Sequence, residues 1–260
     1  MDYMAIDIQY VPIFKDNYIW LIMNKSQNRV IAVDPGDAMP LVHYLSENKL
    51  VLDAILITHH HFDHTNGIKA LTDYYSVNVY GPKNEKIQGV THGVSEPDTI
   101  SFPFLGSLLT VLDIPGHTLH HIAYLLPGLL FCGDTLFSAG CGRIFEGTVE
   151  QMYHSLQKIA DLPDDTKIFC THEYTLQNLK FAQLVEPNNE KIQLNIKNAL
   201  AMRKENRPTL PVLIGEEKEI NPFLRCHIDE IIKSVEKESG LTLNNPLDVF
   251  KYLREWKNSF

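Results

Sequence analysis

The sequence predicts a mixed α/β domain followed by a smaller helical domain. Short apolar runs separated by turn residues fill the first two thirds of the chain. Glycine becomes rare after residue 173, where only Gly215 and Gly240 remain of the 14 glycines. From there on, apolar residues recur with the spacing of amphipathic helices. We therefore expect one domain over residues 1–173 and a second, helical domain over residues 174–260.

The strands expected in the first domain are apolar runs rich in strand-forming residues, and several of them end at a turn. Val30–Val33 ends at Asp34-Pro35-Gly36, and Leu108–Ile114 ends at Pro115-Gly116. Pro127-Gly128 separates two further runs, which predicts a hairpin. The expected strands are Tyr18–Met23, Val30–Val33, Ala54–Ile57, Val77–Tyr80, Leu108–Ile114, His121–Leu126, Leu129–Cys132 and Lys167–Cys170.

Helices are expected in both domains, and they dominate the second domain. Thr148-Val149-Glu150-Gln151 has the form of a capping box, which predicts a helix from there to about Ala160. The remaining expected helices are Leu41–Asn48, Asn66–Tyr75, Leu176–Val185, Asn189–Glu205, His227–Lys237 and Asn245–Lys257.

Composition narrows the function classes. The chain has 260 residues, is 44% hydrophobic and carries a net charge of −9, which is typical of a soluble globular protein and opposes binding to nucleic acid. No apolar run approaches the ~18–20 residues that span a bilayer. Residues 1–4 show no secretory signal, so we expect a cytoplasmic protein without a membrane partner. The four cysteines contain no CxxC pair, so we expect reduced thiols rather than disulfides.

Histidine is unusually frequent, with 12 copies. Histidine and acidic residues gather in four short clusters. Each cluster follows an expected strand, and strand ends can meet along one edge of a sheet. The clusters are His59-His60-His61-Phe62-Asp63-His64, Pro115-Gly116-His117-Thr118, Cys132-Gly133-Asp134-Thr135 and Thr171-His172-Glu173-Tyr174.

The types of donor in these clusters predict a two-metal site. Imidazole and carboxylate together suit zinc, iron or manganese, and the absence of paired cysteines opposes a closed structural zinc site. A tight loop after residue 58 would let His59 and His61 bind one ion while Asp63 and His64 turn to a second. One carboxylate could bridge the two ions. On an extended segment His60 points to the opposite side from His59 and His61, so it is not expected to be a ligand. His120 or His121 could instead contact a ligand without binding the metal.

At these residues the sequence resembles the metallo-β-lactamase superfamily, whose signature is HxHxDH followed by His, Asp and His. More closely it resembles glyoxalase II, the hydroxyacylglutathione hydrolases. The resemblance covers nearly the whole chain and includes FKDNYIWL at 14–21, THHHFDH at 58–64, PGHT at 115–118, GDTLFSAGCGRIFEGT at 133–148, THEYTLQNLKFA at 171–182, EPNN at 186–189, NPFLR at 221–225 and LREWK at 253–257.

The resemblance implies an αββα sandwich with a smaller C-terminal all-helical domain that completes the substrate cleft. It implies one metal site at His59, His61 and His117 and a second at Asp63, His64 and His172, with Asp134 bridging them. The implied reaction is hydrolysis of S-(R)-lactoylglutathione to D-lactate and glutathione, the second step of methylglyoxal detoxification. We expect two divalent ions per chain, zinc first, with iron and manganese as alternatives, and a monomeric protein.

The family's glutathione contacts correspond to Arg143, Phe145, Tyr174, Arg254 and Lys257. The animal enzymes have Lys and Tyr at the first two positions. Arg143 keeps the charge, whereas Phe145 has no hydroxyl and can act only through its backbone or by packing. Arg254 and Lys257 have i,i+3 spacing, which also fits a solvated helix face with Lys251 and Glu255 as ion-pair partners.

The predicted mechanism is attack of a metal-bridging hydroxide on the thioester carbonyl. Asp63 is expected to orient the nucleophile or hold its proton, and Asp134 to bridge the ions. A thiolate leaving group with a pKa near ~8.5 needs little help from an acid. The alternatives are another hydrolase of the superfamily, such as a lactonase, a glutathione-linked sulfur dioxygenase with one iron, and a metal-binding protein without catalysis.

Overall fold

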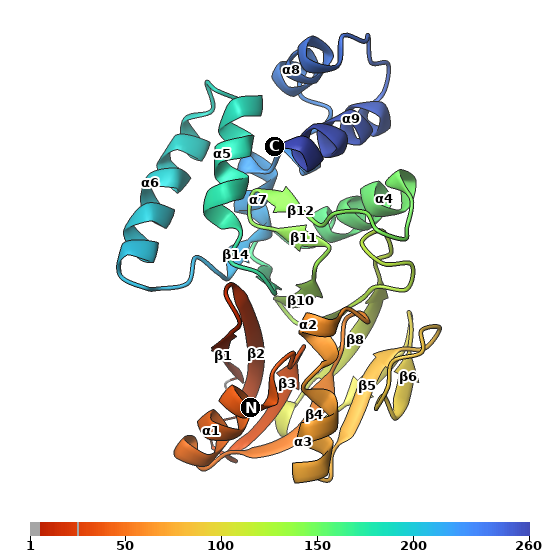
Figure 1. Cartoon of the computed structure of the whole chain (residues 1–260), viewed down its shortest axis with the longest axis vertical. Helices are drawn as coiled ribbons and strands as arrows, with labels where there is room; N and C mark the ends of the chain where they lie inside the picture. The colour runs from red at the N-terminus through yellow and green to blue at the C-terminus, as the bar shows by residue number, and fades with distance from the viewer. Residues whose placement is uncertain (1–5, 25) are drawn as a thin grey trace. The chain divides into compact units, whose positions relative to one another are not determined.

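The computed structural model describes residues 6–24 and 26–260 (Figure 1). The expectation about residues 1–4 lies outside these residues. The chain forms two compact units, and neither is continuous in sequence. The first unit contains Met1–Asp113 and His120–Gly133, and the second contains Ile114–Leu119 and Asp134–Phe260. These units cut the chain at other places than residue 173, so the predicted domain boundary stays a prediction.

Six strands of the first unit form one sheet in sequence order. β1 (Ile6–Ile13), β2 (Asn17–Asn24) and β3 (Arg29–Val33) are antiparallel, whereas β4 (Val51–Leu56), β5 (Asn78–Pro82) and β6 (His92–Val94) continue in parallel from β3. Parallel neighbours need crossover connections. Helix α1 (Ala38–Asn48) connects β3 to β4, and the short α2 (Phe62–Thr65) and α3 (Ile68–Tyr74) connect β4 to β5 (Figure 1).

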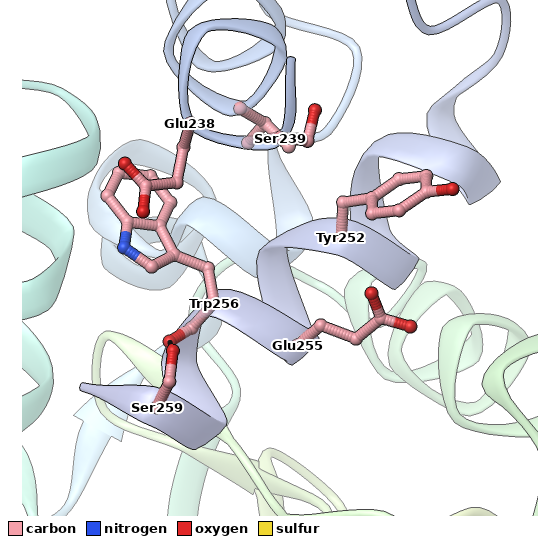
Figure 2. A pocket seen from close by; sticks show the side chains of 7 residues that line it. Glu238, Ser239, Tyr252, Glu255, Trp256 and Ser259 are labelled. Atoms are coloured by element: carbon pink, nitrogen blue, oxygen red, sulfur yellow. Dashed lines mark hydrogen bonds between the residues drawn. The ribbon is translucent and has the colours of Figure 1, made fainter. Parts of the chain in front are cut away.

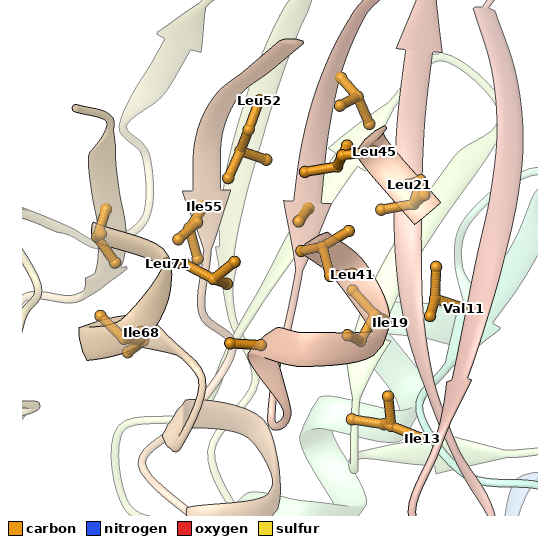
Figure 3. Close-up of a cluster of buried hydrophobic side chains, with 14 of the residues drawn as sticks. Val11, Ile13, Ile19, Leu21, Leu41, Leu45, Leu52, Ile55, Ile68 and Leu71 are labelled. Carbon is orange, nitrogen blue, oxygen red and sulfur yellow. The ribbon is translucent and has the colours of Figure 1, made fainter. Parts of the chain in front are cut away.

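The core of this half of the unit forms between the sheet and its helices. Leu41 and Leu45 of α1 and Leu71 of α3 are buried against the β-strand residues Ile19, Leu21 and Ile55 (Figure 3). β2 is buried along its whole length, which explains why its sequence NYIWLIMN is a continuous apolar run rather than an alternating one.

The strand β1 was not predicted from the sequence. It contains Pro12, which lacks the N–H that a central strand would need, and most of its residues are only half-buried. The structure places β1 at the edge of the sheet, where proline is tolerated.

A second group of antiparallel strands completes the first unit, in the order β10-β9-β8-β7. Their bounds are β7 (Thr99–Ser101), β8 (Leu108–Asp113), β9 (Ile122–Leu126) and β10 (Leu129–Gly133), and the 3₁₀ helix η1 (Pro103–Leu105) lies between β7 and β8. The hairpin predicted at Pro127-Gly128 is the β9–β10 turn. The buried Tyr124 of β9 donates a hydrogen bond of 2.8 Å to the carbonyl of Ile57, which follows β4.

The second unit is largely helical. Its elements are β11 (Leu136–Phe137), β12 (Gly140–Cys141), α4 (Val149–Ala160), β13 (Lys167–Cys170), α5 (Thr175–Val185), α6 (Glu190–Lys204), β14 (Val212–Leu213), α7 (Ile214–Ile220), η2 (Pro222–Leu224), α8 (Asp229–Ser239) and α9 (Pro246–Ser259). The capping box predicted for α4 is confirmed, because Thr148 and Gln151 exchange backbone and side-chain hydrogen bonds. Helix α7 was not predicted, because its seven residues are too few to show a helical period.

The mixed α/β character and the helical C-terminal part are confirmed. All four cysteines are buried. Within residues 6–24 and 26–260, the helices are too short or too polar to cross a membrane.

Candidate metal centre

Four predicted ligands of the first unit lie in the loop after β4 and at the start of α2. The ring atom Nε2 of His59 lies 3.1 Å from Nδ1 of His61. One turn further, Nε2 of His64 lies 3.5 Å from Oδ2 of Asp63. The loop therefore gathers all four donors, because the rings of His59 and His64 also lie 4.1 Å apart between centroids.

The buried carboxylate of Asp34 orients this loop from behind. Its Oδ2 lies 3.0 Å from Nδ1 of His64 and accepts a 2.8 Å hydrogen bond from the hydroxyl of Thr58. The backbone N–H of Thr58 donates to Oδ1 of the same carboxylate at 2.8 Å. The hydroxyl of Thr58 in turn lies 3.0 Å from Nδ1 of His59. One carboxylate therefore orients one imidazole directly and a second through Thr58.

Asp34 reaches this position because of the sheet topology. β3 and β4 are parallel neighbours with Val33 opposite Leu56, so the residues that follow them leave the same edge of the sheet. Asp34 has a φ of 53°, a left-handed conformation that is uncommon outside glycine and that often marks a functional site. The next turn residue, Gly36, allows close approach, because a Cβ there would lie 1.8 Å from the carbonyl oxygen of Asp63.

Two more residues support the same loop. Asn17 donates a hydrogen bond of 2.9 Å from Nδ2 to Oδ2 of Asp63. The ring of His121 is stacked on that of His59 at 4.6 Å between centroids. Of His120 and His121, it is therefore His121 that contacts a predicted ligand. Nδ1 of His60 contacts the carboxylate of Glu85, and its ring lies 4.9 Å from that of His61.

The second unit contains the other three predicted ligands, and all three are nearly fully buried. Oδ2 of Asp134 lies 3.5 Å from Nε2 of His117 and 3.2 Å from Nε2 of His172. One carboxylate oxygen thus faces two imidazole rings, one from a residue before Asp134 in the sequence and one from a residue after it. This placement is compatible with the bridging role predicted for Asp134, which stays a prediction.

The backbone around Arg143 holds His117 in place. Nδ1 of His117 donates to the carbonyl of Arg143 at 2.7 Å, and the N–H of Phe145 donates to the carbonyl of His117 at 3.1 Å. Position 142 requires glycine, because a Cβ there would lie 2.0 Å from the carbonyl oxygen of Asp134 and 3.2 Å from Nδ1 of His117.

His172 is held by aromatic packing. The ring of Tyr174 is stacked on it at 4.6 Å, and the ring of Phe137 lies edge-on at 5.9 Å. Glu173, between the two stacked residues, accepts a 2.9 Å hydrogen bond from the backbone N–H of Thr209. The turn that carries His172 is therefore anchored to the loop before β14.

These contacts test whether the donor set suits a metal ion. In metal sites, one nitrogen of each histidine ligand usually donates to a carboxylate or carbonyl, which leaves the other nitrogen unprotonated for the metal. Nδ1 of His64 faces Asp34 and Nδ1 of His117 faces the carbonyl of Arg143, so in both rings Nε2 is the nitrogen placed to act as a metal donor. Imidazoles prepared in this way, together with Asp63 and Asp134, fit divalent zinc, iron or manganese.

The predicted substrate residues all belong to the second unit, and two of them are cations that point inward from α9. Arg254 is only 7% exposed, and its Nη1 donates to the carbonyl of Cys141 at 2.8 Å. Its Nε and the Nζ of Lys257 are buried without a hydrogen-bond partner among the described residues. Burial first, and the nearby positive charge of Arg254 second, lower the pKa of Lys257 to about 8.

Two cationic groups with buried donors of this kind are suited to an anion, which is compatible with the predicted role of Arg254 and Lys257. The alternative reading of these residues, a solvated helix face, is wrong for Arg254. Lys251 on the same helix is exposed, and its Nζ lies 5.2 Å from the centroid of the Tyr252 ring.

Arg143 and Phe145 lie on the surface beside His117. The guanidinium of Arg143 is 6.0 Å from the centroid of the Phe145 ring, and this ring is 5.3 Å from that of His117. Phe145 is 59% exposed, which is unusual for phenylalanine and leaves its ring available for packing against a ligand.

A separate pocket of about 240 Å³ lies between α8 and α9. Tyr252, Glu255 and Trp256 of α9 and Glu238 and Ser239 of α8 line it (Figure 2). Its lining includes none of the predicted metal or substrate residues. It also accounts for Glu255, which faces this pocket instead of pairing with Arg254.

Comparisons with known proteins identify the family. The model described as "Metallo-beta-lactamase superfamily" matches residues 16–172, and the model described as "Hydroxyacylglutathione hydrolase C-terminus" matches residues 173–260. The "Hydroxyacylglutathione hydrolase" of Nitrosomonas eutropha is 50% identical over 258 residues, which is 98% of this chain and 99% of that protein. The chain belongs to the hydroxyacylglutathione hydrolase family. The protein of the same description from Vibrio campbellii is also 50% identical, over 98% of this chain and all of its own length.

Membership of this family confirms both the resemblance and the metallo-β-lactamase-like fold predicted from the sequence. Among solved structures, "ETHE1 from Myxococcus xanthus" has a TM-score of 0.65 at 24% identity and covers 98% of this chain and 99% of its own. At that identity, the likeness supports the fold alone.

Sequence reasoning missed the residues that orient the ligands in this family member. Asp34 was interpreted only as part of a turn, and Asn17 was noted only as part of the FKDNYIWL motif at 14–21. Their patterns are weak in the sequence, because each lies more than twenty positions from the ligand that it contacts. The position of Asp34 directly after a predicted strand, like the four histidine and aspartate clusters, is the one feature that could have indicated it.

Proposed function

We propose that this chain hydrolyses 2-hydroxyacyl thioesters of glutathione, and S-(R)-lactoylglutathione in particular, to D-lactate and glutathione. The observation that carries the proposal is the full-length similarity, at about half of all positions, to proteins described as hydroxyacylglutathione hydrolases. The buried cations of α9 support it independently. Glutathione has two carboxylates, and Arg254 and Lys257 offer unused donors at a buried site.

We propose further that seven residues hold two divalent metal ions: His59, His61 and His117 for one, Asp63, His64 and His172 for the other, and Asp134 for both. The pairing of donors within the first unit supports this division. Asp134 supports it as well, because one oxygen faces both His117 and His172. Zinc is the proposed ion, and the same donors accept iron or manganese.

Divalent ions at these residues would lower the pKa of water and polarise the thioester carbonyl. The chain's own residues then have separate tasks. Asp63, held by Asn17, orients the attacking water and accepts its proton at a carboxylate oxygen. Asp34 and the carbonyl of Arg143 keep the ligand imidazoles in their working orientation.

The glutathione part is bound by the second unit. Arg254 and Lys257 pair with its carboxylates, and the hydroxyl of Tyr174 can bond to its peptide groups while its ring remains stacked on His172. Phe145 packs against the ligand through its exposed ring. The leaving thiolate is the base of a thiol with a pKa near ~8.5, so the chain needs no dedicated acid for it.

The test is a hydrolysis assay combined with metal analysis on the purified chain. We expect about two metal ions per chain, turnover of S-lactoylglutathione, and loss of turnover after chelation that returns when metal is added. Absence of turnover in fully metal-loaded protein would refute the proposal. One iron per chain with oxygen uptake on a glutathione persulfide would favour the sulfur dioxygenase alternative, and turnover of lactones alone would favour the lactonase.

We also propose that the protein is a cytoplasmic monomer whose partner is the thioester itself. The net charge of −9 supports the absence of a nucleic-acid partner. Light scattering coupled to size-exclusion chromatography tests the monomer, with a mass of 29.7 kDa as the expected result.

A further inference from the structure

The tight turn between β11 and β12 has an unusual set of supports. Phe137 and Gly140 face each other across the hairpin, with Ser138 and Ala139 at its tip. All four residues are buried, and Ala139 has a φ of 53°. A buried turn of this kind leaves backbone N–H and C=O groups that require partners, because no water reaches them.

Side chains from two helices supply these partners. Oε2 of Glu217 in α7 accepts a 2.8 Å hydrogen bond from the N–H of Ala139. Nδ2 of Asn221, which follows α7, lies 3.1 Å from the carbonyl of Phe137 and 3.0 Å from that of Gly140. Asn221 also donates to Oε2 of Glu217 at 2.9 Å, so the two side chains form one unit.

From the other side, Nδ2 of Asn178 in α5 donates to the carbonyl of Ser138 at 3.1 Å. Each of the four residues 137–140 is therefore held through its backbone by a side chain of the helical part of the chain. The two contacts of Asn221 and the contact of Glu217 span about eighty positions in sequence.

This turn is joined to the candidate metal centre on both sides. Asp134 lies two residues before β11, and the N–H of Gly142, just after β12, donates to the carbonyl of Thr135 at 3.1 Å. The ring of Phe137 lies against those of His172 and Tyr174, at 5.9 and 5.3 Å. A shift of the turn would move Asp134 and would release the packing against His172.

Burial of Glu217 is costly, which argues against an incidental role. The carboxyl is fully buried, and burial raises its pKa from 4.5 to about 7, with Glu216 as the charged neighbour that adds to the rise. A leucine at this position would avoid that cost, but it would leave the N–H of Ala139 without a partner.

We propose that Glu217 and Asn221 are positioning residues for the metal centre: they fix the 137–140 turn and thereby the orientation of Asp134 and the packing of Phe137 against His172. This rests on the proposed function insofar as Asp134 and His172 are metal ligands. The helical part of the chain then has a second role beside substrate binding, because it determines how firmly the ligand loop is held.

The test compares Glu217→Ala, Glu217→Gln and Asn221→Ser with the control Glu219→Gln on the same helix. Glu219 is exposed and pairs with Lys191 on the surface, so its change should have no effect. The first readout is metal retention: the number of ions per chain after equilibration with a competing chelator. The second is the split between KM and kcat for S-lactoylglutathione in protein saturated with metal.

We expect Glu217→Ala and Asn221→Ser to weaken metal binding by about 10- to 100-fold, as for other changes behind a metal ligand. At full metal loading, kcat should fall by a larger factor than KM rises, because the turn adjoins Asp134 and His172 directly. Glu217→Gln should restore retention to nearly that of the wild type, since its amide oxygen can still accept from Ala139.

Circular dichroism and thermal unfolding of the metal-free variants show whether they fold. If Glu217→Ala does not fold, Asn221→Ser and Glu217→Gln decide the question. Wild-type metal retention in a folded Glu217→Ala or Asn221→Ser variant would overturn the proposal, and so would a Glu217→Gln variant as defective as Glu217→Ala. A wild-type chain that binds metal but does not turn over the thioester would refute the proposed function instead, and the comparison of metal retention would still stand.

Discussion

Replacing Lys257 with methionine should make the protein more stable and a poorer enzyme at the same time. The ammonium of Lys257 is buried without a hydrogen-bond partner among the described residues, and its pKa is lowered from 10.5 to about 8. At ~1.4 kcal/mol for each pH unit, that fall corresponds to at most roughly 3 kcal/mol of lost stability. Lys257 is only half-buried, so screening by water reduces the cost to about 1 kcal/mol.

Methionine removes this cost while it keeps the apolar contacts of the side chain. The rings of Phe181 and Phe260 form cation–π contacts with Nζ of Lys257 at 5.0 and 4.8 Å, and methionine replaces them with sulfur–aromatic contacts of similar strength. We expect the Tm of Lys257→Met to rise by about 2–4 °C at pH 7. The folded protein releases the lysine proton above pH 8, earlier than the unfolded chain does, so the gain should shrink as the pH rises from about 8 towards 10.5.

The same change should weaken substrate binding. Loss of one hydrogen bond between an ammonium and a carboxylate costs ~1.5–3 kcal/mol, so KM for S-lactoylglutathione should rise about 10- to 100-fold with little change in kcat. Lys251→Met is the matched control, because Lys251 lies on the same helix but is exposed. An unchanged KM in Lys257→Met would show that Lys257 does not bind the substrate, and a lower Tm at pH 7 would show that burial of its ammonium does not cost stability.

Three further predictions concern other parts of the molecule. Asp34→Ala should weaken metal binding about 10- to 100-fold in a chelator competition, because His64 and Thr58 lose their acceptor; unchanged retention would mean that the loop holds its shape without Asp34. Arg254→Ala should raise KM more than it lowers kcat, and equal effects on KM and kcat would contradict a role in binding alone. The same change should lower the Tm, since the carbonyl of Cys141 loses its donor. Glu217→Gln should flatten the dependence of stability on pH. The pKa of Glu217 is raised to about 7 on folding, so the wild type loses up to ~3 kcal/mol as the pH rises from about 4.5 to 7. Urea unfolding of both proteins at pH 5 and pH 8 measures this difference, and parallel slopes would refute it.

Local patterns in the sequence were sufficient for features that depend on neighbouring residues. The capping box at Thr148 predicted the start of α4, because both of its hydrogen bonds join residues three positions apart. The cluster at 59–64 likewise brings four donors together within one loop, whatever the rest of the chain does. Short or irregular elements were missed for the same reason: α7 is too short to show a period, and β1 contains a proline at a sheet edge.

Local sequence patterns could not predict whether Arg254 is solvated or buried. Its i,i+3 spacing to Lys257 is equally compatible with a solvated helix face and with a buried site. Only the packing of α9 against the segment at Cys141 decides between them, since it buries the guanidinium and supplies its acceptor.

The sequence by itself determined the family and predicted the candidate donors with their local order, because these depend on residue type and on spacing along one strand or one turn. Tertiary structure alone decided what supports those donors: Asp34 behind His64, the carbonyl of Arg143 behind His117, and Glu217 and Asn221 beneath the turn after Asp134. The physical reason is that a buried polar group can be satisfied by any chemically suitable partner. The chain contains many such partners, and only the fold selects which one lies within 3 Å.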